Sequence, residues 1–129
     1  MTNIVPQTAD LNQFPWEQLE SYSRLLARQG NTIYTVSGVY GDRERLRNRI
    51  TAPTNCWKII AVIPPGRKEI DASTRIIAVD IPNIDGIERT TWQKYSTTVR
   101  LIEEKTGYDL FRTLPRDIQN AIELSIDRK

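Results

Sequence analysis

The side chains near the start of the sequence that could do chemistry carry oxygen. Asn12 and Glu20 are eight residues apart, and Asn3 precedes them. Amide and carboxylate oxygens are ligands that Mg²⁺ accepts in proteins. These residues also have ordinary roles, because Asn12 can cap the start of a helix and Glu20 can pair with Arg24 on a helix surface. Taken residue by residue, the ordinary roles are the more common ones.

A second candidate is the basic run over residues 42–49. Its four arginines are Arg43, Arg45, Arg47 and Arg49. A planar guanidinium group suits a phosphate, so the run could help to hold a nucleic-acid backbone. The alternative is a solvated loop whose charge is partly neutralised by Asp42 and Glu44, and the sequence favours that alternative.

The composition of the sequence excludes an intrachain disulfide and gives no sign of a membrane helix. At 129 residues the chain is long enough for a real core, and we expect one domain over residues 1–129. The net charge of +2 is too small to identify a polyanionic ligand. Cys56 is the only cysteine, which excludes an intrachain disulfide, and its strand-like surroundings predict a buried apolar role. No apolar run approaches the ~18–20 residues of a membrane helix.

The spacing of apolar residues predicts a helix that would position the first group of side chains. Residues 16–27 are apolar at every third or fourth position, which indicates an amphipathic helix. Pro15 suits its first turn and Gly30 its C-terminal cap. Asn12 would then lie at the helix entrance and Glu20 within the helix.

Two more helices are predicted near the end of the sequence. Residues 99–106 show helical spacing, with Leu101 and Ile102 on one side and Gly107 as cap. Residues 115–126 begin with a proline and carry isoleucines four positions apart, which indicates another amphipathic helix.

Strand patterns fill the middle of the sequence. The strongest is residues 56–63, closed by Pro-Pro-Gly, with residues 75–81 as its hairpin partner. Residues 33–37 predict a strand that ends at Gly38, and residues 95–99 a short strand. Antiparallel strands framed by helices predict an α+β fold.

Several short motifs occur in the order found in one known family. They are the segment 2–20 with Asn12 and Glu20, Thr-Val-Ser-Gly at 35–38, Trp-Lys-Ile-Ile at 57–60, the strand ending in Pro-Asn at 79–83, and the Glu and Thr-Gly turn within 102–111. Together they resemble the DNA/RNA non-specific endonucleases, sugar-indifferent nucleases with a ββα-metal (His-Me finger) site. The resemblance runs through nearly the whole chain.

The resemblance implies a metal site in the first segment. In that family an asparagine holds the divalent cation, and a glutamate eight residues later serves its hydration shell. Those positions are Asn12 and Glu20, with Mg²⁺ as the expected ion and Mn²⁺ as an alternative. Eight residues of helix rise ~12 Å, which makes direct ligation of one small ion by both residues difficult, so we expect Glu20 to act through water. Asn3 would orient the loop on the metal side or else form a structural turn.

The same family has its catalytic histidine upstream, in an Asp-Arg-Gly-His motif. This sequence starts after that point and contains no histidine. We therefore expect the C-terminal portion of such a domain, an antiparallel sheet flanked by helices that is incomplete at the N-terminus. A sheet edge or a core face would then be exposed.

These expectations combine into a function. The resemblance implies a metal-dependent endonuclease that hydrolyses phosphodiester bonds, with the backbone of DNA and RNA as partner. The upstream segment of the same domain would be needed for completion, and the chain alone is expected to be inactive or nearly so because the base is absent. The alternatives are a non-catalytic nucleic-acid-binding module derived from that family and a scaffold fragment without a ligand.

Overall fold

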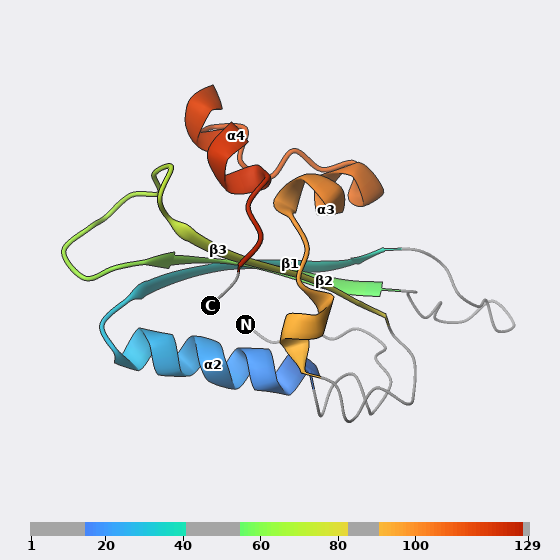
Figure 1. The fold of residues 1–129 in the computed structure, drawn as a ribbon, viewed down its shortest axis with the longest axis horizontal. Helices are drawn as coiled ribbons and strands as arrows, with labels where there is room; N and C mark the ends of the chain where they lie inside the picture. The colour runs from blue at the N-terminus through green and yellow to red at the C-terminus, as the bar shows by residue number, and fades with distance from the viewer. Residues whose placement is uncertain (1–14, 41–54, 83–90, 128–129) are drawn as a thin grey trace, which may run out of the picture.

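A computed structural model of the chain describes residues 15–40, 55–82 and 91–127. Within those ranges the chain forms a three-stranded antiparallel sheet between two layers of helix (Figure 1). A long helix, α2, covers one face, and two short helices, α3 and α4, lie over the other. This is the α+β fold that the sequence predicts. None of the helices in those ranges is long and apolar enough to cross a membrane.

Helix α2, Glu17–Arg28, forms as its apolar spacing predicts. Its buried residues Leu19 and Leu26 are about two helical turns apart and therefore share one face. This face packs against the sheet in a core that also contains Trp16. Gly30 follows the helix with a φ of 99°, a left-handed conformation that glycine adopts without a steric penalty, and this confirms its predicted role as cap.

Strand β2, Asn55–Ile63, is the centre of the sheet and is buried at every position except the first. It pairs antiparallel with β1, Thr32–Tyr40, on one side and with β3, Arg75–Pro82, on the other. The hairpin between β2 and β3 is therefore confirmed. Because β2 is central, its side chains fill the space on both faces of the sheet.

Alternate side chains of a strand point to opposite faces, so β2 contributes to two cores. Cys56 and Ile60 belong to the core between the sheet and α2, whereas Trp57 and Ile59 belong to the core beneath α3 and α4. Cys56 is fully buried, which confirms the apolar role that the sequence predicts for it.

Strand β1 is longer than the sequence predicts, because Gly38 does not end it. The strand continues through Gly38 to Tyr40. Gly38 lies opposite Trp57 in the register, and a Cβ atom there would stand 2.7 Å from Cζ2 of the indole. The glycine makes room for Trp57 and forms no turn, so the prediction that the strand ends at this residue is wrong.

Helix α3, Val99–Thr106, has the predicted bounds, and Gly107 ends it in a left-handed conformation. Its buried face is formed by Val99 and Ile102, whereas Leu101 is 46% exposed. Adjacent helical residues are rotated by about 100° from each other, so both cannot face the same core here. The prediction that Leu101 and Ile102 share a side is wrong.

Two other predictions for the C-terminal third need correction: the short strand over residues 95–99, and the residue at which the last helix ends. Residues 95–99 do not form a strand, because Trp92–Tyr95 is a short 3-10 helix, η2, and Ser96 makes only an isolated bridge to β3. This segment carries the chain from the core beside α2 to the core beneath α3, which prevents a longer pairing with the sheet. The predicted helix over residues 115–126 is confirmed as α4, Arg116–Glu123, but it ends before Ile126, which is 42% exposed.

Candidate functional site

The residues that the sequence singles out fall partly outside the described structure. Asn3 and Asn12 of the predicted metal segment lie outside the described residues, and so do the four arginines of the run 42–49. Glu20 lies within them, on α2, and its surroundings are defined.

Glu20 stands in the first turn of α2, between the core and the solvent. Its Oε1 atom lies 3.6 Å from Nζ of Lys58, and 39% of its side chain is exposed. Arg24, the alternative partner on the helix surface, instead donates to Glu17 Oε1 and Ser21 Oγ, each at 3.0 Å. Glu20 is therefore paired with the sheet, and its carboxylate keeps access to solvent.

Sequence reasoning quotes Lys58 only within the Trp-Lys-Ile-Ile motif at 57–60 and gives it no role in the site. It lies in β2 between Cys56 and Ile60, on the side of the sheet that faces α2, and only 8% of its side chain is exposed. Its Nζ atom is 4.4 Å from the centre of the Trp16 ring. Burial lowers the pKa of Lys58, and the charge and hydrogen bond of Glu20 oppose this shift. The signal in the sequence is a lysine at a core-facing position of an apolar strand.

The contact between Glu20 and Lys58 fits a carboxylate that binds water near a cation. An ammonium group 3.6 Å from the carboxylate would repel a cation bound directly to the same oxygen atoms. A carboxylate that accepts hydrogen bonds from the waters of a cation keeps the two positive charges farther apart. This contact argues against direct ligation of a cation by Glu20, and the expected role of Glu20 through water stays a prediction.

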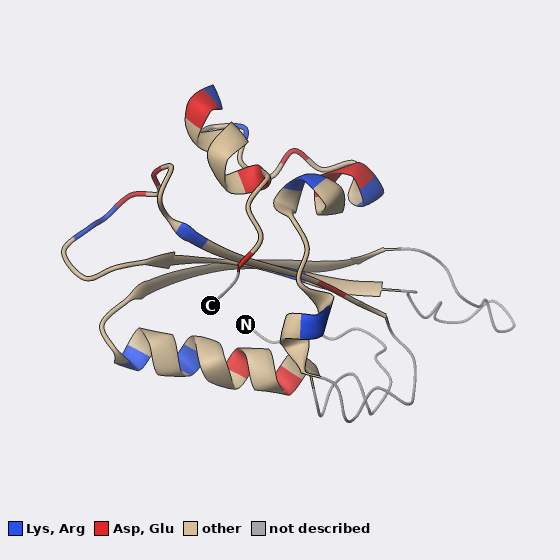
Figure 2. Cartoon of the chain, viewed as in Figure 1, with Lys and Arg blue, Asp and Glu red and all other residues tan. Residues whose placement is uncertain are grey.

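Charges are separated along α2. Figure 2 shows acidic residues at the beginning of the helix and basic residues towards its end, with Glu17 and Glu20 in the first turn and Arg28 in the last. This order is favourable for the helix dipole, whose positive end is at the N-terminus. The acidic end of α2 is the one that the predicted metal segment precedes in the sequence.

A second polar group surrounds Asp80 of β3. Its carboxylate accepts hydrogen bonds from Tyr40 Oη at 2.6 Å, Asn55 Nδ2 at 2.8 Å and Lys105 Nζ at 3.2 Å. Burial raises the pKa of Tyr40, and the hydrogen bond to Asp80 adds to this shift. The three donors come from β1, β2 and α3, so this group connects the sheet to a helix and has a structural role.

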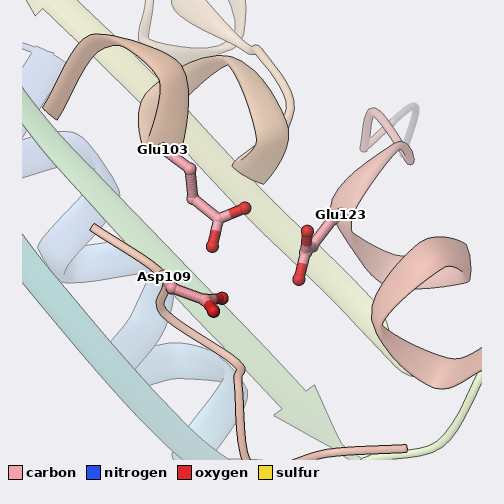
Figure 3. A group of neighbouring side chains, drawn as sticks. All are labelled: Glu103, Asp109 and Glu123. Atoms are coloured by element: carbon pink, nitrogen blue, oxygen red, sulfur yellow. The ribbon is translucent and has the colours of Figure 1, made fainter. Parts of the chain in front are cut away.

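A third polar group brings three carboxylates together near α3 and α4 (Figure 3). Oxygen atoms of Glu103, Asp109 and Glu123 lie within 4.8 Å of one another, close enough to hold a cation. Glu103 Oε2 accepts the backbone N–H of Leu110 at 2.7 Å, and Arg100 donates to Glu123 Oε1 at 3.2 Å. These contacts join the two helices and the segment between them. The sequence analysis did not predict this group.

Burial perturbs Glu103 within this carboxylate group. Burial raises the pKa of Glu103, the bond from Leu110 opposes the shift, and the neighbouring Glu123 adds to it. Oε2 of Glu123 is buried and has no hydrogen-bond partner in the described part of the chain. The group belongs to the layer of α3 and α4 and is therefore separate from Glu20, which lies on the opposite face.

Comparison with known proteins places this chain among nucleases. The sequence model of the DNA/RNA non-specific endonuclease family matches residues 1–117. A nuclease of Nostoc sp. is 40% identical over 131 residues, which cover 98% of this chain and 47% of that protein. A nuclease of Serratia marcescens is 26% identical, over 95% of this chain and 46% of that protein. Mitochondrial endonuclease G of Homo sapiens is 25% identical, over 83% of this chain and 39% of that protein.

A solved structure has a similar fold. It is a chain of an EndoG/EndoGI complex, with a TM-score of 0.70 and 19% sequence identity, and the match covers 95% of this chain and 51% of that chain. The chain spans about half the length of the Nostoc and Serratia nucleases that it matches. Since the family match extends over residues 1–117 of 129, the chain belongs to the DNA/RNA non-specific endonuclease family.

Proposed function

We propose that this chain supplies the metal-binding part of an endonuclease that hydrolyses phosphodiester bonds of DNA and RNA. Asn12 is the principal protein ligand of a divalent cation, Mg²⁺ or Mn²⁺, and Glu20 acts through water. The observation that carries the proposal is the Glu20 carboxylate, which is 39% exposed and paired with buried Lys58. Glu20 also lies in the part of the chain that the family sequence model matches.

Each residue has its own task in this proposal. When bound, the cation would supply Lewis-acid stabilisation of the charge that develops on the phosphate and the leaving oxygen. The neutral amide of Asn12 would anchor it without cancelling its charge. Glu20 would accept hydrogen bonds from water and so fix the position of the hydrated ion. The arginines of the run 42–49 would contact phosphate groups.

The reaction also needs a base, and this chain contains no histidine. A general acid–base group contributes about 10²–10⁴-fold to a reaction rate. In our proposal the Asp-Arg-Gly-His segment typical of the family supplies that base. The 129-residue chain by itself is then expected to cleave nucleic acid very slowly or not at all.

The test compares the chain with a complemented protein, in which a relative's segment ending in the Asp-Arg-Gly-His region is fused to it or co-expressed with it. Plasmid DNA and RNA are incubated with each protein in the presence of Mg²⁺ or Mn²⁺. We expect cleavage by the complemented protein, and its loss when the histidine of the added segment is changed to alanine. Rapid cleavage by the chain alone, abolished by Asn12→Ala, would contradict the proposal.

The metal assignment has a separate test, which is calorimetric titration of the chain with Mn²⁺. We expect weak binding that is lost in Asn12→Ala and reduced about tenfold in Glu20→Gln. Glu104→Gln, at an exposed position on α3, is the matched control and should bind as the parent does. Unchanged affinity in Asn12→Ala would exclude Asn12 as the ligand.

A second candidate function is a nucleic-acid-binding module without catalysis, in which the arginines of the run 42–49 would contact phosphate groups. This alternative predicts that the complemented protein shifts DNA in a gel but gains neither cleavage nor stability. The endonuclease proposal predicts a gain in both.

A further inference from the structure

Lys58 brings a charge into the core between β2 and α2. Only 8% of its side chain is exposed, and removal from water disfavours an ammonium group. A methionine or leucine could fill the space between Cys56 and Ile60 without that penalty. Packing alone therefore does not account for a lysine at this position.

The surroundings of Lys58 direct its ammonium group towards one acceptor. Its Nζ atom lies 3.6 Å from Oε1 of Glu20 and 4.4 Å from the centre of the Trp16 ring. The ring face attracts a cation and shields that side of it from water. Two more charges of α2 act on Lys58 more weakly, Glu17 by attraction and Arg24 by repulsion. Among the described residues, Glu20 is the carboxylate that faces this ammonium group.

We propose that Lys58 is a positioning residue for Glu20, an inference that rests on the proposed function. A glutamate that is 39% exposed on a helix can adopt several rotamers, whereas a lysine enclosed by the sheet and Trp16 has few. The ion pair selects one orientation of the Glu20 carboxylate. The acceptor for the water of the cation is then already in place before the cation binds.

If Lys58 positions Glu20, replacing Lys58 should weaken metal binding and leave the stability of the fold nearly unchanged. Lys58→Met removes the buried partner of the ion pair, and the Glu20 carboxylate that remains is 39% exposed, so water can solvate it and no buried charge is left unpaired. In Lys58→Met the core between β2 and α2 should therefore remain packed, while Glu20 regains rotational freedom. A lysine that merely stabilised the fold would give the opposite result, with a lower melting temperature and no specific change in metal binding.

The experiment is a double-mutant cycle, measured by titration of the full chain with Mn²⁺. We expect Lys58→Met and Glu20→Gln each to weaken binding about tenfold, and the double variant to bind no more weakly than Glu20→Gln. The effects do not add because Lys58 acts through the carboxylate that Glu20→Gln removes. Lys58→Arg keeps the positive charge and should bind Mn²⁺ more tightly than Lys58→Met.

The matched control is Lys105→Met, which removes another lysine next to a carboxylate, 3.2 Å from Asp80. It should leave the Mn²⁺ affinity unchanged. Circular dichroism and melting curves verify that each variant is folded. Should Lys58→Met fail to fold, Lys58→Gln takes its place in the cycle, because its amide is uncharged and can still hydrogen-bond.

The two proposals fail in different ways. If Glu20→Gln weakens Mn²⁺ binding and Lys58→Met does not, or if their effects add in full, Lys58 does not position Glu20 and the proposed metal site still stands. If neither Asn12→Ala nor Glu20→Gln changes the affinity for Mn²⁺, the proposed metal site is wrong. The proposed role of Lys58 is then wrong as well.

Discussion

The carboxylates of Glu103 and Glu123 lie close together and are both mostly buried. Their side chains are 11% and 5% exposed, and Arg100 donates its two hydrogen bonds in this group to Glu123. Burial raises the pKa of Glu103 above its usual 4.5, and the charge of Glu123 adds to the shift although the N–H of Leu110 opposes it. The folded protein therefore binds a proton at Glu103 more tightly than the unfolded chain does.

This difference predicts how stability depends on pH. The contribution of Glu103 to the free energy of unfolding should fall as the pH rises through the window between 4.5 and its raised pKa. Glu103→Gln removes the titration, so the variant should be more stable than the parent at neutral pH. That advantage should shrink as the pH falls through the window, because the parent then gains its proton.

Urea unfolding of parent and variant at a series of pH values measures this effect. Glu104→Gln changes the same kind of side chain at an exposed neighbouring position and should show no such trend. A stability difference between Glu103→Gln and the parent that stays constant over the pH series would contradict the prediction.

At the scale of elements, the pairing of β1 with β2 depends on Gly38. The indole of Trp57, which is 2% exposed, occupies the space that a side chain at position 38 would need. We expect Gly38→Ala to lower the free energy of unfolding by about 1–3 kcal/mol, because a Cβ atom must displace a buried ring. In a Trp57→Phe background the same change should cost less, since the smaller ring leaves room.

Chemical denaturation of the four proteins in this cycle measures the coupling between Gly38 and Trp57. If Gly38→Ala cost the same in both backgrounds, the close approach of the ring would not be the reason for glycine.

Elements with strong local periodicity are the ones that the sequence predicts well. Helix α2 and strands β2 and β3 follow their apolar patterns closely, and α3 ends at its glycine as expected. Local signals suffice there because the buried face and the cap both lie within the element. The predicted α+β class follows from these four elements.

The remaining features depend on residues that are far apart in the sequence. From the sequence alone Gly38 is expected to end a strand, because its pairing with Trp57 is seen only in the folded sheet. Lys58 can be recognised as a charge in an apolar run, but its partner Glu20 is fixed only when α2 docks on the sheet. Residues 95–99 have a strand-like pattern, and the crossing from one face of the sheet to the other overrides it.

At the scale of the whole molecule, the layer of α3 and α4 leaves part of β1 uncovered. Tyr34 and Val36 are 53% and 45% exposed, although they lie opposite Ala61 and Ile59, which are buried on that face. In the described ranges β1 pairs with β2 on one side only. An apolar strip beside a strand edge with which no described strand pairs is a surface that another segment could cover.

We expect the complemented protein to be more stable than the chain alone for this reason. Its melting temperature should rise, and the backbone amides of β1 should exchange more slowly with solvent, because added strands would pair with or cover this edge. The histidine-to-alanine version of the added segment should show the same gain, since the base contributes to catalysis and not to packing. Hydrogen exchange of β1 that is unchanged by complementation would exclude this edge as the contact.

The position of Lys58 above Trp16 also makes that indole an internal optical reporter. Excitation moves electron density within an indole ring, so a positive charge 4.4 Å from its centre should alter the emission maximum. A variant with Trp57 and Trp92 changed to phenylalanine would retain Trp16 as its sole tryptophan. If a hydrated cation binds beside Glu20 as proposed, its charge would change the electric field at this ring, and the fluorescence of Trp16 would then follow occupancy of the proposed site without an added dye.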